Sequence, residues 1–122
     1  MKHHLIAPLL AVFSLTLAAS PTLAEGSDGE KLFKRKCASC HKMDKHGVGP
    51  MLQGVIGRKA GSTDYAKYVA LNGADFTWDE TNLDAWIADP KKFIGKTTPM
   101  AGKIKGEADR KAIIEYLKSE SD

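Results

Sequence analysis

No part of this sequence limits the possible folds as strongly as the run Cys37-Ala38-Ser39-Cys40-His41. Side chains three positions apart near a helix end project to the same side, so the two thiols can meet the two vinyl groups on one edge of a porphyrin. The histidine that follows can then place an imidazole nitrogen on the iron. This pattern is typical of covalent c-type haem attachment, and it predicts one haem c bound through Cys37 and Cys40 with His41 as an iron ligand.

Other uses of the two cysteines fit the sequence less well. Secreted chains stabilised by disulfides usually carry four or more cysteines at wider spacings, whereas this chain has two. A thioredoxin-like dithiol would need a βαβ context, which the sequence does not show. A structural zinc site would need a second pair of ligands, and after residue 24 only His46 accompanies His41. Chance occurrence of a five-residue pattern is the remaining alternative.

The first 24 residues differ from the rest of the chain. A basic start and an apolar run over residues 5–19 precede the small residues Thr22 and Ala24. This order is typical of a secretory signal peptide, and the run is shorter than the about 20 apolar residues that span a bilayer. We expect cleavage after Ala24 and a periplasmic protein whose residues 25–122 form one domain, with an uncleaved anchor as the alternative.

Capping signals and apolar periodicity predict an all-α chain with three main helices. The run Ser27-Asp28-Gly29-Glu30 fits a capping box that starts a first helix leading to Cys37. A second capping box, Thr77-Trp78-Asp79-Glu80, predicts a helix that ends at Asp89-Pro90. A third helix is expected over 107–118, with Ala112, Ile113, Tyr116 and Leu117 on its buried side.

The segments between these helices lack strand alternation and are expected to be loops and short turns. Residues 47–61 are rich in glycine and proline, which predicts ordered turns. Residues 65–71 could form one or two helical turns, and residues 91–106 are expected to be a loop.

A second axial ligand of the iron must come from elsewhere in the chain, and a methionine thioether is a suitable partner for histidine. Met43 lies too close to the attachment motif to reach the opposite haem face. Met51 directly follows Gly49-Pro50, which leaves little slack in the chain for it to reach that face. Met100 lies on the expected loop far from His41. Spacing alone leaves a core methionine that fills a gap as an almost equal interpretation of Met100.

Charged residues are distributed unevenly along the chain. Residues 31–59 carry eight Lys/Arg against one acid, Asp44, and residues 91–105 carry five lysines and no acid. Residues 60–90 instead hold six Asp/Glu against Lys67 alone. Such blocks are usually solvated faces, and they steer an acidic partner only where they meet around a site.

Beyond the motif, the run from Gly29 to Lys118 resembles class I cytochrome c of the mitochondrial and α-proteobacterial type. The matching residues are Gly29, Phe33, Cys37-Ala38-Ser39-Cys40-His41, Gly47-Val48-Gly49-Pro50-Met51-Leu52-Gln53-Gly54, Gly57-Arg58-Lys59-Ala60-Gly61, Phe76-Thr77-Trp78, Asp89-Pro90-Lys91-Lys92-Phe93, Pro99-Met100 and Glu115-Tyr116-Leu117. The resemblance implies the cytochrome c fold, in which three main helices, short helical turns and loops surround one covalent haem.

The resemblance also implies roles for particular residues. Met100 would be the distal iron ligand, and the Pro50 carbonyl would accept a hydrogen bond from the other ring nitrogen of His41. Arg58 and Trp78 match residues that interact with the haem propionates. Taken without the resemblance, Arg58 is an exposed base and Trp78 an ordinary core residue.

Three further expectations follow from the resemblance. Gly29 and Phe33 would meet Tyr116 and Leu117 where the terminal helices cross. Trp86 lies on an apolar stripe that accounts for it as a core residue, although many relatives have a tyrosine near the methionine ligand at this place. The segment 62–71 aligns poorly, so both of its tyrosines are candidates for a place near a propionate.

With both axial positions filled by the protein, the iron has no place for a substrate, and one-electron exchange between Fe(II) and Fe(III) remains. The resemblance therefore implies a soluble, monomeric electron carrier rather than an enzyme, without a nucleic-acid partner. Its transient partners would be a quinol-oxidising cytochrome complex and a terminal oxidase, photosynthetic reaction centre or periplasmic dehydrogenase.

The alternative functions depend on the second axial ligand. If Met100 does not bind the iron, an open haem could act as a peroxidase or sense a small gas ligand. A structural or metal-storage protein would carry no covalent haem.

Overall fold

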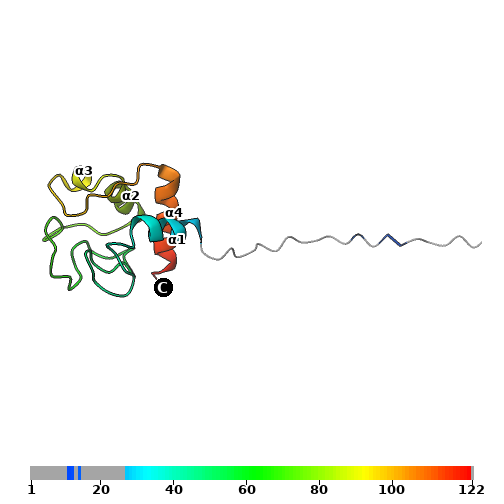
Figure 1. Cartoon of the computed structure of the whole chain (residues 1–122), viewed down its shortest axis with the longest axis horizontal. Helices are drawn as coiled ribbons and strands as arrows, with labels where there is room; N and C mark the ends of the chain where they lie inside the picture. Colours follow the sequence, from blue (N-terminus) through cyan, green and yellow to red (C-terminus); the bar gives the residue numbers. More distant parts are fainter. Residues whose placement is uncertain (1–10, 13, 15–26, 122) are drawn as a thin grey trace, which may run out of the picture.

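Four helices form the frame of the chain in the computed structural model, which describes residues 27–121 and, before them, residues 11, 12 and 14 (Figure 1). The helices are α1 (Asp28–Lys36), α2 (Glu80–Ala88), α3 (Pro90–Ile94) and α4 (Glu107–Ser119). The described residues contain no strand, and the one β-type pairing among them is an isolated antiparallel bridge between Lys59 and Thr77. The expected signal peptide and its cleavage after Ala24 lie almost wholly outside the described residues.

Helix α1 begins as the sequence predicts. The Ser27 hydroxyl accepts a hydrogen bond from the Glu30 backbone N–H at 3.1 Å, which satisfies one of the free donors of the first turn. Acidic side chains occupy the first turn and basic ones the last, in the order that the helix dipole favours. Leu32 and Phe33 are buried, so the helix turns its apolar face to the core and ends just before Cys37.

Helices α1 and α4 cross in close contact at Gly29. A Cβ atom at Gly29 would lie 2.7 Å from the Ala112 carbonyl carbon and 2.9 Å from the Tyr116 Cβ, closer than real atoms approach. The Phe33 and Tyr116 rings lie with their centroids 5.5 Å apart, and Leu117 is buried in the same core. The expected contact of Gly29 and Phe33 with α4 is therefore confirmed.

Helix α2 differs from the prediction at its start. Asp79, not Thr77, is the N-cap, and its carboxylate accepts a hydrogen bond from the Asn82 N–H at 2.7 Å. The prediction of a capping box from Thr77 was wrong because Thr77 and Trp78 continue the extended segment that pairs with residues 57–60. The helix ends at Ala88, as Asp89-Pro90 predicts.

Helix α3 was not predicted, since residues 91–106 were expected to be a loop throughout. Asp89 caps this short helix by accepting a hydrogen bond from the Lys92 N–H at 3.1 Å. Pro90 occupies its first turn, where a missing N–H costs nothing, and Gly95 ends it with a φ of 76°. The Asp89-Pro90 pair thus ends one helix and begins the next.

The remaining predictions are close to the structure. Helix α4 begins at Glu107 as expected and ends one residue later than expected, at Ser119. Its buried residues are Ile113, Ile114 and Leu117, with Ala112 and Tyr116 partly buried. Residues 65–71 form turns rather than a helix.

Helices α1, α2 and α4 enclose an aromatic and aliphatic core, and α3 packs on α2. The core consists of Leu32, Phe33, Val55, Ala60, Trp78, Leu83, Trp86, Ile87, Ile113, Ile114 and Leu117. The prediction of an all-α fold is confirmed. No helix in the part of the chain that the structure describes is both long enough and apolar enough to cross a bilayer.

Candidate cofactor site

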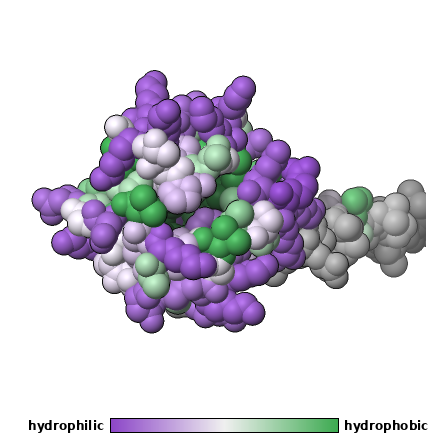
Figure 2. Space-filling model, turned by 60° about the vertical axis from the view of Figure 1, so that its left-hand side comes forward, coloured by the Kyte–Doolittle hydropathy of each residue, from purple (hydrophilic) through white to green (hydrophobic). Residues whose placement is uncertain are grey.

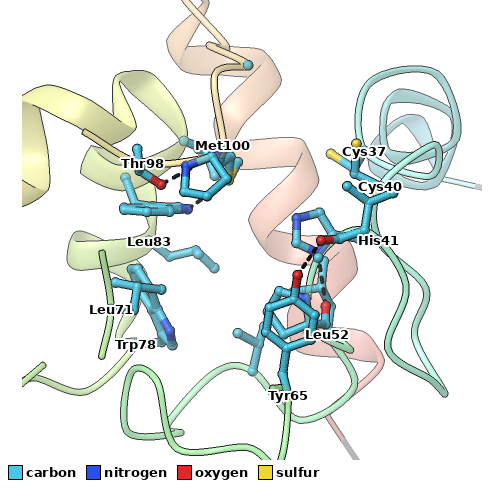
Figure 3. Close-up of a pocket in the computed structure, with 18 of the residues that line it drawn as sticks. Cys37, Cys40, His41, Leu52, Tyr65, Leu71, Trp78, Leu83, Thr98 and Met100 are labelled. Atoms are coloured by element: carbon cyan, nitrogen blue, oxygen red, sulfur yellow. Dashed lines mark hydrogen bonds between the residues drawn. The ribbon is translucent and has the colours of Figure 1, made fainter. Parts of the chain in front are cut away.

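A deep cavity opens on one face of the molecule, between apolar side chains (Figure 2). The segment that follows α1 forms one wall, with Cys37, Cys40 and His41. The opposite wall is the segment 98–102 between α3 and α4, which carries Met100. In Figure 3, His41 and Met100 lie on opposite sides of the cavity. The fold thus brings together the two segments that carry the predicted iron ligands.

The two cysteines lie at the edge of the cavity. Cys37 is partly buried, Cys40 is exposed, and no disulfide joins them. Burial, with a smaller contribution from Cys40, raises the pKa of the Cys37 thiol to about 11, so this thiol is protonated at neutral pH. The described residues also contain no group of three or more His, Cys, Asp or Glu that could hold a metal ion, which removes support for a zinc site.

The imidazole of His41 is fixed by a backbone carbonyl. Its Nδ1–H donates to the Pro50 carbonyl at 2.9 Å, as expected for a histidine that binds iron through its other nitrogen. Burial lowers the pKa of His41, Arg58 adds to this effect, and the hydrogen bond to Pro50 opposes it. The ring is therefore neutral near pH 7, which leaves Nε2 with a free lone pair on the side of the cavity.

Gly49 makes room for that ring. A Cβ atom at Gly49 would lie 2.8 Å from Nδ1 and 2.9 Å from Nε2 of His41, which no larger residue could tolerate without moving the imidazole. The Gly49 N–H donates to the Cys40 carbonyl at 2.7 Å, so the glycine loop is tied to the end of the motif. The backbone of residues 49–50 therefore sets both the position and the tautomer of His41.

The thioether of Met100 accepts a hydrogen bond from a tryptophan. The Nε1–H of Trp86, on α2, lies 3.1 Å from the Met100 sulfur. A sulfur has two lone pairs, and the indole uses one of them. The backbone N–H of Met100 donates to the Thr98 hydroxyl at 3.3 Å, which fixes the turn that presents the side chain. Met43 and Met51 do not line the cavity.

The two other predicted site residues also line the cavity. Arg58 is partly buried and donates to the carbonyls of Met51 at 2.9 Å and Gln53 at 3.4 Å, so it is not the exposed base that the sequence alone suggested. Burial lowers the pKa of Arg58, and Tyr68 opposes this shift. Trp78 is 5% exposed and packs edge-on against Phe76.

Both candidate tyrosines line the same cavity. The Tyr65 hydroxyl donates to the Val48 carbonyl, and the Tyr68 hydroxyl pairs with the Thr63 hydroxyl at 2.6 Å. The two rings meet edge to face, with centroids 5.1 Å apart. Together with Arg58 they place polar groups in the lining of a mainly apolar cavity.

Comparison with known proteins identifies the group to which this chain is related. The family model described as Cytochrome c matches residues 26–121. The chain belongs to the cytochrome c family. It is 40% identical to the cytochrome c of Theileria parva over 100 residues, which cover 80% of this chain and 87% of that protein. It is 36% identical to a cytochrome c2 of Rhodopseudomonas palustris over 110 residues, with 76% and 96% covered.

A solved structure shows the same fold. The cytochrome cH from Methylobacterium extorquens superposes with a TM-score of 0.69 at 42% sequence identity, over 75% of this chain and 95% of that one. The predicted resemblance and the cytochrome c fold are both confirmed. Members of the cytochrome c family carry one covalent haem c and act as electron carriers. The prediction of one covalent haem c is therefore confirmed, and so is the general prediction of electron transport.

The cavity of this chain has the chemistry that such a haem requires. Its lining is mainly apolar, as suits a porphyrin, two thiols lie at one edge, and a neutral imidazole and a thioether lie on opposite sides. These are ligand types that haem iron accepts.

Two residues of this site had no assigned function from the sequence. Trp86 was predicted as a core residue, which its burial confirms, but its hydrogen bond to Met100 was not predicted. Gly49 was part of the matching run, yet nothing in the sequence predicted that it touches His41. The tyrosine that many relatives have in place of Trp86 was the available signal, because both side chains can donate a hydrogen bond.

Proposed function

We propose that this chain is a single-haem electron carrier whose haem is joined by thioethers to Cys37 and Cys40, with the iron between His41 and Met100. The observation that carries the proposal is the opposition of a neutral imidazole and a thioether across one cavity. Haem would supply one-electron exchange between Fe(II) and Fe(III), and two protein ligands would leave no site for a substrate.

The surroundings of Met100 favour the reduced state. A thioether is a weak donor to ferric iron, and the indole N–H of Trp86 draws further electron density from the sulfur. The cavity walls are mainly aliphatic and aromatic, which disfavours the extra charge of the oxidised centre. We therefore expect a high reduction potential for a haem protein.

Arg58 and Trp78 are proposed to bind the haem propionates. The guanidinium of Arg58 lies partly buried at the cavity, held by two backbone carbonyls, and still has N–H donors for a carboxylate. Trp78 lines the same cavity and can contribute its indole N–H. Within the described residues this N–H makes no hydrogen bond to the protein, so it is available to a ligand.

The mouth of the cavity is proposed as the docking surface for redox partners. Val48 and Val69 line the cavity and are 70% and 66% exposed, so apolar side chains lie at the surface beside it. Figure 2 shows apolar patches next to the hollow on this face. Among the described residues, the charged side chains that line the cavity are Lys36, Arg58 and Lys67, and none is acidic. A positive, partly apolar mouth suits brief docking of acidic partners, such as those expected from the family resemblance.

This docking model is tested by the salt dependence of electron exchange with small complexes of opposite charge. The rate with ferricyanide should fall as ionic strength rises, and the rate with a cationic cobalt complex should rise. A Lys67→Gln variant should weaken both trends, whereas Lys111→Gln, on α4 and outside the cavity, should leave them unchanged. Electron-exchange rates that do not change with ionic strength for either complex would contradict the model.

We further propose that residues 1–24 direct export to the periplasm and are then removed. The support is the order of basic, apolar and small residues at the start of the chain. Export also fits attachment of a haem to two thiols, since the maturation of c-type haem would follow translocation. The test compares the mass of the protein purified from the periplasm with the mass calculated for a haem-loaded chain that starts at Glu25.

The ligand set is tested on protein made in a host that attaches haem. The haem stain should survive denaturing electrophoresis, and the ferric protein should show the weak red band of methionine ligation. Met100→Ala should abolish that band, and Met43→Ala, which changes a methionine outside the cavity, should keep it. A red band that persists in Met100→Ala would refute the ligand assignment and reopen the peroxidase or gas-sensor function.

A further inference from the structure

The segment that carries Met100 has few internal contacts. It runs from 95 to 106 between α3 and α4. Within 96–102, the one backbone hydrogen bond that the described structure gives is that from Met100 to the Thr98 hydroxyl. A Cβ atom at Gly102 would meet nothing within 4 Å. This part of the segment therefore depends on its ends for its position.

The end beyond Met100 is held by the side chain of Arg110, on α4. Its Nη1 donates to the carbonyl of Ile104 at 3.1 Å and to that of Lys105 at 2.8 Å. Its Nε donates to the Asp84 carboxylate, on α2, at 2.7 Å. One planar guanidinium thus joins α4, α2 and the methionine segment, a geometry that a lysine ammonium cannot reproduce.

Two further contacts bind the same end to α2 and its C-cap. The Ile104 N–H donates to the Ile87 carbonyl at 2.8 Å, and Lys103 pairs with Asp89 at 3.3 Å. The Lys103 side chain is 50% exposed, so its ion pair contributes little. The side chain of Arg110 is 14% exposed, and its removal would leave two carbonyls and a carboxylate without this donor.

We infer that Arg110 is a positioning residue for Met100, which it serves by holding residues 104–105 against α2. It does not line the cavity, so it acts through the backbone of the segment. This inference rests on the proposed ligation of iron by Met100. The contacts of Arg110 would then lower the affinity of any external ligand that has to displace the Met100 thioether from the iron.

The test is an imidazole titration of the ferric, haem-loaded protein. Loss of the red methionine band reports the displacement of Met100 by imidazole. Arg110→Gln should bind imidazole about tenfold more tightly than the wild type, the order expected for lost hydrogen bonds from a charged donor. Arg110→Lys should fall between the two. Lys118→Gln is the matched control, because Lys118 also joins α4 to α2, through Glu80 at 3.3 Å, without touching the methionine segment.

A second measurement does not depend on ligand binding. The amide of Ile104 should exchange its hydrogen faster in Arg110→Gln, whereas amides in the contact between α1 and α4 should keep the wild-type rate. If Arg110→Gln does not accumulate, Asp84→Asn removes the charge partner alone and should raise imidazole affinity by a smaller factor, about threefold.

The outcomes separate this inference from the proposed function. A wild-type protein without the methionine band would overturn both. A wild type with the band, combined with equal imidazole affinities and equal Ile104 exchange in Arg110→Gln and Lys118→Gln, would overturn the role of Arg110 alone.

Discussion

Replacing Gly29 with alanine should test the contact on which the whole frame depends. The new Cβ would stand 2.7 Å from the Ala112 carbonyl carbon and 2.9 Å from the Tyr116 Cβ, whereas ordinary contact begins at 3.4 Å. The main obstacle is helix backbone, which cannot rotate away as a side chain can. Helices α1 and α4 would therefore have to separate along the contact in which the Phe33 and Tyr116 rings meet.

The expected cost follows from two opposing effects. Overpacking a well-filled contact usually costs about 1–3 kcal/mol, and a rigid backbone places this case at the upper end. The better helix propensity of alanine returns up to about 1 kcal/mol. We expect the free energy of unfolding to fall by about 2–3 kcal/mol, which for a domain of roughly 100 residues lowers Tm by about 10–20 °C.

The assay is denaturant unfolding of the haem-loaded protein. Far-UV circular dichroism and Soret absorbance monitor the transition. Gly47→Ala is the control, since a Cβ there meets only the Cys40 carbonyl oxygen at an ordinary 3.6 Å. Its stability should stay within about 1 kcal/mol of the wild type. A Gly29→Ala protein that unfolds within about 0.5 kcal/mol of the control would show that the helices yield easily and would refute this reasoning.

Three further predictions concern the site and its supports. Trp86→Phe removes the donor to the Met100 sulfur and should lower the reduction potential by up to about 60 mV, the one-electron equivalent of about 1.4 kcal/mol. A redox titration measures this shift, and an unchanged potential would contradict the prediction. Gly49→Ala should push the His41 ring from its place and cost about 1–3 kcal/mol in unfolding experiments, with a visibly altered Soret band. The Lys92 N–H and then Lys103 hold the pKa of Asp89 below 3.8, so the carboxylate stabilises the fold above about pH 4 and this contribution is lost as the pH falls through the lowered pKa. The stability advantage of the wild type over Asp89→Asn should therefore be constant above about pH 5 and shrink between about pH 4 and pH 2, and an advantage that stays constant down to about pH 2 would count against the assignment.

The parts of the fold that were predicted correctly depend on near neighbours in the chain. The Ser27 cap, the end of α2 at Asp89-Pro90 and the start of α4 each follow from residues within one or two turns. The error at the start of α2 has a different cause. At α2 two capping residues, Thr77 and Asp79, were available, and the bridge from Lys59 to Thr77 decided between them. Such a choice needs a segment that is distant in the sequence.

The family resemblance extended the site prediction beyond local signals. It placed Pro50 against His41 and brought Met100 and Arg58 to the same cavity, which the structure shows as geometry. It did not predict that the indole of Trp86 donates to the Met100 sulfur, because Trp86 was accounted for as a core residue.

The sequence by itself determined the chemistry available to this protein: two thiols three positions apart, an adjoining imidazole and a small set of methionines. These depend only on covalent spacing, which folding cannot change. The tertiary structure alone decided that Gly49 frames His41, that Trp86 reaches Met100 and that Arg110 holds the segment beyond it. Each of these contacts joins segments whose approach depends on how the helices pack, and the separation of two residues along a chain does not fix their distance in a folded one.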